Sequence, residues 1–349
     1  MQIVGLGLCT LDILMRLHEM PTWEHGGALE GLRFDGGGPV ATALAAAARL
    51  GATTGFVGTC GSDEIAALKM ECMTREGIDT SRVTVRAGVE AQVVLVYVHA
   101  GSGERIFIGA PHFGHVPLKV SELDQDYITS AGILHLDGFH SEAALQAARW
   151  MHAAGKRVVL DGGKTDGHLG TEMRELVALA DILICGSGFA PALTGESDMY
   201  KAGRAALRLG PSIVVLTEGE AGSFTFSGEE EFHTPAYKVD VVDTTGAGDV
   251  FHGAYLVGLL HGWDLRRIAT FATAVAASLL ECGAVSITTK SAFASFALFK
   301  MPSNCAAVAP TATSSFSFSL SCIHLSPVAC GSISINKTVF PFIAAQKAK

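Results

Sequence analysis

Two glycines and an acid stand at one sharp transition in the chain. In VVDTTGAGDVFHGAYLVGLL, residues 241–260, Gly246, Gly248 and Asp249 separate a β-branched pair from a long apolar run. The pattern predicts a strand that ends near Val242, then a turn, then a helix that starts near Asp249. Because the first amides of a helix have no intrahelical partner and carry roughly half a positive charge, this turn is suited to bind an anion.

Asp249 has two interpretations at such a helix start. It could cap the helix, a position where aspartate is favoured. It could instead accept a proton from an attacking hydroxyl while the turn amides stabilise a transferring phosphoryl group. The chain has no G-x-x-x-x-G-K-[ST] loop, and GLGLCT near its start lacks the third glycine of a dinucleotide fingerprint. A dinucleotide-dependent oxidoreductase is therefore not expected.

The elements that must position these residues are short and alternate in type. A strand, a turn and a strand are predicted over QIVGLGLCTLDILMRL, then a glycine loop and a helix over GGGPVATALAAAARLGA. Four apolar runs are typical of buried strands, namely GILHLDG, RVVLDGG, DILICGS and SIVVLTEG, and helical patterns separate several of them. A hairpin over 91–109 and two final helices, 249–261 and 265–281, complete the pattern. It predicts an α/β fold with a mainly parallel sheet and helices on both faces.

Composition limits the classes of function. The 349 residues are 49% hydrophobic, carry a net charge of −9 and contain no cluster of Lys or Arg, so we expect a sizeable core and no binding to nucleic acid. The eight cysteines form no C-x-x-C pair, which argues against zinc ligation and favours reduced thiols in a cytosolic protein. The N-terminus lacks a basic region before its apolar run, which predicts a first strand rather than a signal peptide, and a cytoplasmic location.

The last part of the chain has a different character. Residues 301–349 contain no Asp, Glu or Arg and only three Lys, and serine alternates there with apolar residues. We interpret this tail as a disordered or non-native extension, with a β-appendage as the alternative. Ser, Pro and Asn interrupt its apolar runs, so insertion into a membrane is not expected.

Four segments resemble one family in their order and spacing. DTTGAGDVFHGA resembles the C-terminal signature of the ribokinase-like (PfkB-type) carbohydrate kinases, and GGGPVATALAAAARLGATTGFVGTCGSDE resembles their glycine signature. GLGLCTLDILMRLHEMP is similar to the first strand of the family, and LTEGEAGS to its T-x-G-x-x-G nucleotide segment. In chain order, the first and last signatures are specific and the middle ones are weak. The match as a whole spans roughly residues 1–285.

The resemblance implies a fold, a reaction and an assembly. The fold is a ribokinase-like, three-layer, Rossmann-like α/β domain over residues 1–300, with a small β-lid built from 12–35 and 88–112. The reaction transfers a phosphoryl group from ATP, with Mg²⁺, to a sugar hydroxyl, so the expected partners are ATP and a small sugar. Because lid strands often pair between subunits in this family, a homodimer through the lid is a possible assembly.

The resemblance also implies a role for each motif residue. Asp249 would be the base that activates the sugar hydroxyl. The anion hole would comprise Gly246, Ala247 and Gly248, the sugar site Asp12, Gly37, Gly38, Thr42 and Arg105, and the nucleotide site Thr217, Gly219, Gly222 and Thr273. Without the family, Asp12 fits a turn residue and Arg105 a solvated hairpin charge. The nucleotide residues likewise fit a strand-end turn and helix packing.

Two departures from the family pattern concern the sugar and the metal. Thr42 stands at the place of a sugar-contacting Asn, and no added basic pair is evident, so we expect a neutral acceptor that resembles fructose, ribose or a sugar acid. Gly186 and Phe189 take the Asn and Glu places of an N-x-x-E motif that organises magnesium. Mg²⁺ would then be held by ATP itself, by water and by Asp161 or Asp243.

Other features leave the function partly open. The segment after the last helix has no clear loop match, which makes K⁺ activation doubtful. His135, His140 and His252 are expected to be structural or to line a pocket without catalytic work. A kinase-like protein that binds sugar or nucleotide without turnover and a nucleoside kinase are the alternatives to a sugar kinase.

Overall fold

The computed structural model describes residues 1–110, 116–165, 167–241 and 244–282. Asp243 and the tail at 301–349 therefore lie outside the described residues, as do the last two residues of the lid range 88–112. None of the described helices combines the length and the apolar character that a membrane crossing requires.

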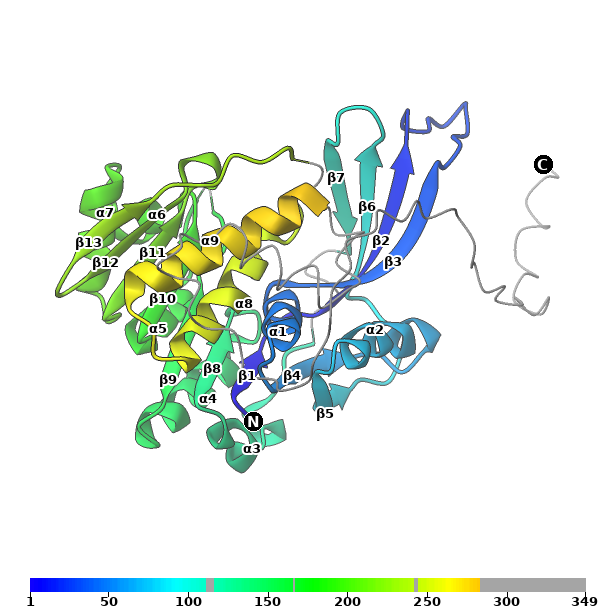
Figure 1. Ribbon diagram of the computed structural model, residues 1–349. Coiled ribbons are helices and arrows are strands. Elements are labelled where there is room, and N and C mark those ends of the chain that lie inside the picture. Colours follow the sequence, from blue (N-terminus) through cyan, green and yellow to red (C-terminus); the bar gives the residue numbers. More distant parts are fainter. Residues whose placement is uncertain (111–115, 166, 242–243, 283–349) are drawn as a thin grey trace, which may run out of the picture. The chain divides into compact units, whose positions relative to one another are not determined.

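A nine-stranded sheet forms the centre of the described chain (Figure 1). Its strands are β1 (Ile3–Leu6), β4 (Thr54–Cys60), β5 (Asp79–Val85), β8 (Ile133–Leu136), β9 (Arg157–Asp161), β10 (Ile182–Gly186), β11 (Ile213–Thr217), β12 (Ser223–Ser227) and β13 (Glu231–Thr234). They lie in the order β13-β12-β11-β10-β9-β8-β1-β4-β5, parallel from β11 to β5 and antiparallel at the β12–β13 edge. The carboxyl ends of the parallel strands therefore share one edge, where ligands bind in such sheets.

Helices cover both faces of this sheet, and each face has its own hydrophobic core. One face packs against α1 (Pro39–Arg49), α8 (Ala247–Leu260) and α9 (Leu265–Cys282), with α2 (Glu64–Arg75) beside them. The other face packs against α3 (Gln125–Ser130), α4 (Ser141–Ala153), α5 (Thr171–Leu179), α6 (Phe189–Thr194) and α7 (Met199–Leu207). Because both faces are covered, β1 and β4 are buried along their whole lengths. The predicted α/β fold is confirmed.

Two local predictions need correction. Helix α8 begins at Ala247, two residues before the predicted start at Asp249. The prediction of a strand that ends near Val242 is wrong, because residues 235–241 form neither a helix nor a strand. The β-branched residues of VVDTT signalled a strand, but residues 235–241 pair with no described strand of either sheet.

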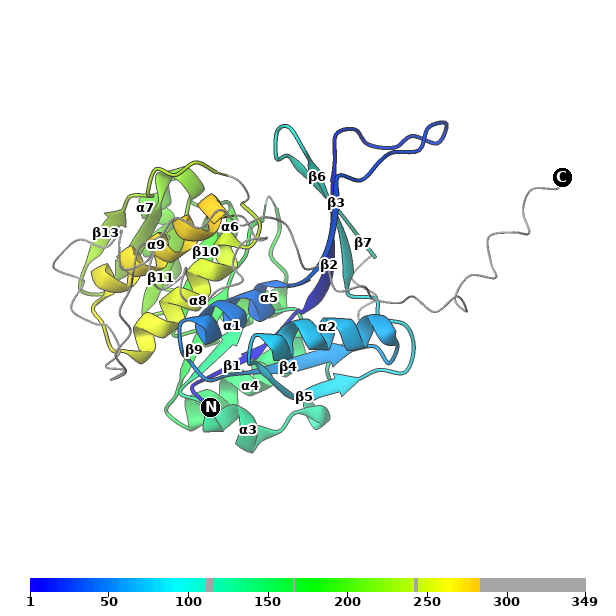
Figure 2. The same cartoon turned by 45° about the vertical axis from the view of Figure 1, so that its right-hand side comes forward.

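A second, small sheet stands away from the main sheet (Figures 1 and 2). It contains β2 (Thr10–Leu17), β3 (Gly31–Gly37), β6 (Val93–His99) and β7 (Arg105–Gly109), in the order β3-β2-β6-β7. The predicted hairpin over 91–109 is present as the antiparallel pair β6–β7. Strand β2 leaves β1 after three residues, so the first crossing from one sheet to the other is short.

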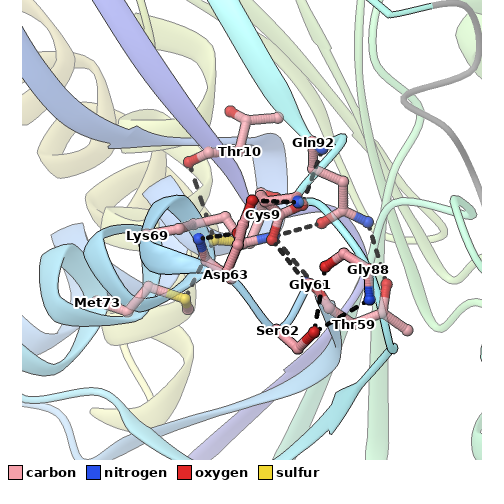
Figure 3. A network of polar contacts seen from close by, with 12 residues as sticks. Cys9, Thr10, Thr59, Gly61, Ser62, Asp63, Lys69, Met73, Gly88 and Gln92 are labelled. Carbon is pink, nitrogen blue, oxygen red and sulfur yellow. Dashed lines mark hydrogen bonds and ion pairs between the residues drawn. The ribbon is translucent and has the colours of Figure 1, made fainter. Parts of the chain in front are cut away.

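A buried polar network lies where the chain crosses between the two sheets (Figure 3). Lys69 of α2 is completely buried, and its ammonium group lies 2.6 Å from the carboxylate of Glu90. The same ammonium group donates to Gln92 Oε1 at 2.8 Å and lies 3.4 Å from Cys9 O and 3.3 Å from Thr59 O. Cys9 precedes β2 and Gln92 precedes β6, so one cation contacts both crossings into the small sheet.

The acceptors of this network are satisfied by further hydrogen bonds. Glu90 accepts from the backbone N–H groups of Gly61 at 2.9 Å and Gln92 at 2.8 Å. The Gln92 amide donates to Thr59 Oγ1 at 3.1 Å. A buried ion pair with this many partners avoids the cost of an unpaired buried charge.

Replacing Lys69 by Met should strongly destabilise the protein. The Glu90 carboxylate would stay buried without its cation, and we expect a loss of about 3–5 kcal/mol in the free energy of unfolding, measured by urea denaturation. Lys69→Met combined with Glu90→Gln should recover part of this loss, because no unpaired charge remains.

The matched control is Arg82→Met, which removes an ion pair with Asp124 whose side chains are 44% and 38% exposed. We expect a far smaller change there, because solvent screens exposed pairs. Equal effects of Lys69→Met and Arg82→Met would show that the buried pair does not stabilise the fold.

Candidate active site

The turn before α8 is a left-handed glycine followed by a helix N-terminus. Gly246 has φ +72°, a conformation that strains other residue types, and Ala247 is the first helical residue. The Val250 N–H donates to Gly246 O at 2.8 Å and closes the first turn of the helix. The Ala247 N–H donates to Thr244 O at 3.3 Å. The other first amides lack partners further back in the helix, so the predicted anion hole at 246–248 keeps a suitable backbone at Gly248.

Asp249 is the third residue of α8 and not its cap. The N-cap is Gly246, and no side chain caps the helix. The Asp249 carboxylate still lies in the first turn, where the helix dipole favours a negative charge. The capping interpretation is therefore wrong, although a weaker dipole interaction remains.

Other acids surround the Asp249 carboxyl group. Burial raises its pKa well above the usual range of an aspartate, and the carboxylates of Asp161, Asp137 and Asp12 raise the pKa further. A carboxylate with a raised pKa holds a proton more strongly once it has accepted one. Such a perturbed group in a cleft is suited to general base catalysis.

A cleft of about 680 Å³ lies between the small sheet and the start of α8. Asp12, Phe107 and Arg105 line it from the small sheet, and Gly246 and Asp249 line it from the other side. A cavity of about 140 Å³ shares Asp12, Gly38, Gly246 and Asp249 with the cleft. Gly36, Gly37 and Thr42 also line this second cavity.

The glycine loop lets Asp12 lie directly over the backbone. A Cβ atom added to Gly37 would be 2.3 Å from the Asp12 carboxylate, so only glycine fits there. Gly38 has φ +94°, and a Cβ atom there would meet Leu8 O at 2.5 Å. The Thr10 hydroxyl donates to Asp12 Oδ1 at 2.6 Å. Burial raises the pKa of Asp12 to about 6, although the Thr10 hydrogen bond lowers it.

Arg105 connects the small sheet to the turn before α8. Its guanidinium group donates to the hydroxyls of Thr244 and Thr245. It therefore points into the cleft beside Asp249 and is not free on the hairpin surface. The two threonines were not predicted as its partners from the sequence, although both belong to the DTTGAGD segment.

Asp161 lies behind Asp249 at the end of β9. It is 5% exposed, and its Oδ1 accepts the Gly163 N–H at 2.6 Å. Burial raises its pKa. Asp161 lines neither cavity at Asp249.

The predicted nucleotide residues lie at the end of β11 and in α9, and they line neither of these two cavities. Gly219 and Gly222 have φ +53° and +87° and enclose a short 3₁₀ turn after β11. The Thr217 hydroxyl donates to Cys185 O at 3.3 Å. The Thr273 hydroxyl is buried and donates to Ala269 O at 2.8 Å, as the packing interpretation of that residue requires.

Asp137 is a site residue that was not predicted from the sequence. It follows β8, and it accepts the N–H groups of Leu8 at 2.8 Å and Phe139 at 2.9 Å. Burial raises its pKa to about 6. The sequence did contain a signal for Asp137, because this acid directly follows the buried run GILHL. Asp161 follows the buried run RVVL in the same way. Carboxyl ends of parallel strands meet at one edge, which brings such acids together.

Comparisons with known proteins show which family this chain is similar to. The family model for "pfkB family carbohydrate kinase" matches residues 4–291. Aminoimidazole riboside kinase of Salmonella typhimurium is 32% identical over 277 residues, which cover 73% of this chain and 83% of that protein. An ATP-dependent ribose-1-phosphate kinase of Halopiger xanaduensis is 26% identical, with 79% of this chain and 90% of that protein covered.

The fold is shared with solved structures. Ribokinase of Arabidopsis thaliana, complexed with ribose and ATP, superposes with a TM-score of 0.71. It is 24% identical, and the match covers 85% of this chain and 98% of that one. The predicted ribokinase-like architecture is thereby confirmed.

Asp12→Asn should stabilise the protein at neutral and alkaline pH. The folded state holds the Asp12 proton more tightly than the unfolded state does, so ionisation between about pH 4 and pH 6 costs the wild type stability. Asn does not ionise. We expect the variant to be more stable by up to about 3 kcal/mol near pH 8, with the difference vanishing near pH 4.

Thermal unfolding at several pH values measures this difference, and Asp124→Asn serves as the control. Hydrogen bonds from Tyr127 N–H and from Arg82 lower the pKa of Asp124, so its removal should act in the opposite direction at neutral pH. An Asp12→Asn variant that is less stable than wild type at alkaline pH would disprove the assigned electrostatic strain.

Proposed function

The chain belongs to the pfkB family of carbohydrate kinases, and we propose that it transfers the γ-phosphoryl group of ATP to a hydroxyl of a small sugar, with Asp249 as the base. The observation that carries this proposal is the cleft in which Asp249, at a helix N-terminus, and Asp12, over the glycine loop, line opposite walls. A sugar bound there can donate one hydroxyl to each carboxylate.

The reaction needs positioning and charge stabilisation more than covalent chemistry by the protein. Asp249 accepts the proton of the attacking hydroxyl, and its raised pKa makes it a strong enough acceptor. The amides of Gly246, Ala247 and Gly248 are proposed to offset the negative charge of the transferring phosphoryl group, for which the Ala247 N–H would have to leave Thr244 O. Thr217, Gly219, Gly222 and Thr273 remain the proposed nucleotide side of the site.

The small sheet acts as the lid over the sugar. Arg105 reaches from β7 to the hydroxyls of Thr244 and Thr245, so it closes the lid against the turn that carries the anion hole. Closure keeps water away from the phosphoryl group and so favours transfer over hydrolysis.

Magnesium is proposed to arrive with ATP and to stay mainly on its phosphates. The described residues offer oxygen ligands at the strand ends, but Asp161 is buried beside two histidines, which Mg²⁺ does not prefer. When bound, Mg²⁺ neutralises phosphate charge. K⁺ activation is not proposed.

The acceptor is proposed to be a small neutral carbohydrate that resembles a ribose, a fructose or a sugar acid. Thr42 lines the smaller cavity, and its methyl group lies beside Gly246. The two relatives named above act on a riboside and on ribose 1-phosphate by name, which keeps nucleosides as the second acceptor class to test.

Asp249→Asn should lower kcat by about 10²–10⁴-fold, because the amide cannot accept the proton. The measurement is ATP-dependent product formation over a panel of ribose, fructose, sugar acids and nucleosides. Wild-type kcat/KM should fall as pH is lowered through the raised pKa of Asp249, because the protonated base is inactive.

Equal turnover by wild type and Asp249→Asn would exclude the assigned base. Calorimetric binding of ATP and sugar without any product would instead identify a kinase-like binding protein, the alternative that the missing Glu at Phe189 suggested.

We also propose that the chain forms a homodimer through the outer face of the lid. Strand pairing places two rows of apolar side chains on one face, Leu32–Met15–Tyr97–Ile106 and Phe34–Ile13–Leu95–Ile108. The end residues of both rows are 42–55% exposed. Asp12 and Phe107 line the cleft from the opposite face. A continuous apolar sheet face of this kind is suited to a second copy of itself.

Light scattering should show a dimer for wild type and a monomer for Phe34→Asp combined with Ile108→Asp. The control is Val85→Asp, which changes an apolar residue that is 61% exposed on β5, outside this face. A monomeric wild type would exclude the dimer without affecting the proposed reaction.

A further inference from the structure

Three buried side chains form a cluster behind Asp249 that the proposed reaction does not use. His135 comes from β8, Asp161 from the end of β9, and His252 from the first turns of α8. Their exposed fractions are 0%, 5% and 4%. Each side chain offers one ligand atom, and the three atoms lie within 4.8 Å of one another.

The spacing suits a small metal ion. His252 Nε2 lies 3.5 Å from Asp161 Oδ1, and two ligand atoms of a tetrahedral zinc ion are about 3.4 Å apart at bond lengths near 2.1 Å. An ion centred among three atoms 4.8 Å apart would be about 2.8 Å from each, so shifts of roughly 0.7 Å would reach bonding distance.

His135 already has the hydrogen bonding of a metal ligand, whereas Nδ1 of His252 has no hydrogen-bond partner among the described residues. His135 Nδ1 lies 3.3 Å from Val159 O, and because a carbonyl only accepts, Nδ1 carries the proton. Its Nε2 then presents a lone pair, and this buried atom has no hydrogen-bond partner among the described residues. A ligating histidine typically donates its other N–H to a backbone carbonyl in the same way.

Charge supports the same conclusion. A metal ion binds the neutral form of an imidazole, and both rings are buried here. The carboxylates of Asp161 and Asp137 repel that of Asp249. A bound cation would offset this repulsion.

We propose that His135, Asp161 and His252 bind one divalent transition-metal ion of the zinc type, which joins α8 to β8 and β9 beneath Asp249. Two imidazoles and one carboxylate favour Zn²⁺ or Co²⁺ over Mg²⁺. This ion is therefore distinct from the magnesium that accompanies ATP. The expectation against zinc rested on the cysteines, and these three ligands are too far apart in sequence to form a recognisable motif.

The first test is metal content and cobalt spectroscopy of the full chain. Protein is purified from zinc-supplemented growth and dialysed against metal-free buffer. Elemental mass spectrometry should then find one Zn²⁺ per chain. Protein stripped with a chelator should take up one Co²⁺ and show the visible absorption of tetrahedral cobalt. A thiolate-to-cobalt charge-transfer band should be absent, because none of the ligands is a cysteine.

Variants locate the ion. His252→Gln and His135→Gln should each lower Co²⁺ affinity at least 10-fold and remove the rise in melting temperature that Zn²⁺ gives the stripped wild type. His140→Gln is the matched control, a buried histidine outside the cluster that should keep the metal. Asp249→Asn should also keep the metal while losing activity, which separates this inference from the proposed base.

Wild type without equimolar zinc and without the cobalt spectrum would overturn the proposal, even if the histidine variants failed to fold. So would folded His135→Gln and His252→Gln variants that retain one metal ion per chain.

Discussion

The buried ion pair between Lys69 and Glu90 determines how the small sheet is attached to the main one. The Lys69 ammonium group contacts groups at both chain crossings, Cys9 O before β2 and Gln92 before β6. The pair is buried, and its hydrogen-bonding groups all have partners. A movement of the small sheet relative to the main sheet would therefore expose one of the two charges or leave it unpaired. The walls of the cleft come from these two sheets, so the distance between Asp12 and Asp249 depends on this attachment.

The cleft so defined is electrostatically costly. Burial raises the pKa values of Asp12, Asp137, Asp161 and Asp249, and neighbouring carboxylates raise those of Asp12, Asp137 and Asp249 further, so each carboxylate is less stable in the folded chain than in water. The protein offsets part of this cost locally. Backbone N–H groups donate to Asp137 and Asp161, and the Thr10 hydroxyl donates to Asp12. Concentrated, strained acids of this kind are typical of a site selected for reaction and not for stability.

Sequence predicted the elements whose signals are local. Pro39 and the following alanines predicted α1, and the glycines before them predicted the loop in which Gly38 adopts a positive φ. Asp12 and Asp249 were paired through family motifs, and the structure places both on one cleft. Contacts between distant segments had no local signal. Three such contacts depend on which segments the fold brings together: Arg105 with Thr244, Asp137 with Asp161, and His135 with His252. The strand predicted to end near Val242 was wrong because β-branched propensity alone does not determine whether a segment pairs with a sheet.

The missing magnesium motif is explained by packing. Phe189 begins α6 and is fully buried in the core, where its ring would contact a Cβ atom added to Gly162 at 3.0 Å. A carboxylate at this position would be a buried charge among apolar side chains. The replacement of the family's Glu by Phe189 is therefore tied to the packing of the surrounding core. At Gly186, a Cβ atom would meet Lys164 Cγ at 2.9 Å, so an Asn side chain there would have to displace the Lys164 side chain. In the proposed reaction the ATP phosphates would therefore hold magnesium without this motif, which makes the helix N-terminus at 246–248 more important here than the sequence motif alone indicated.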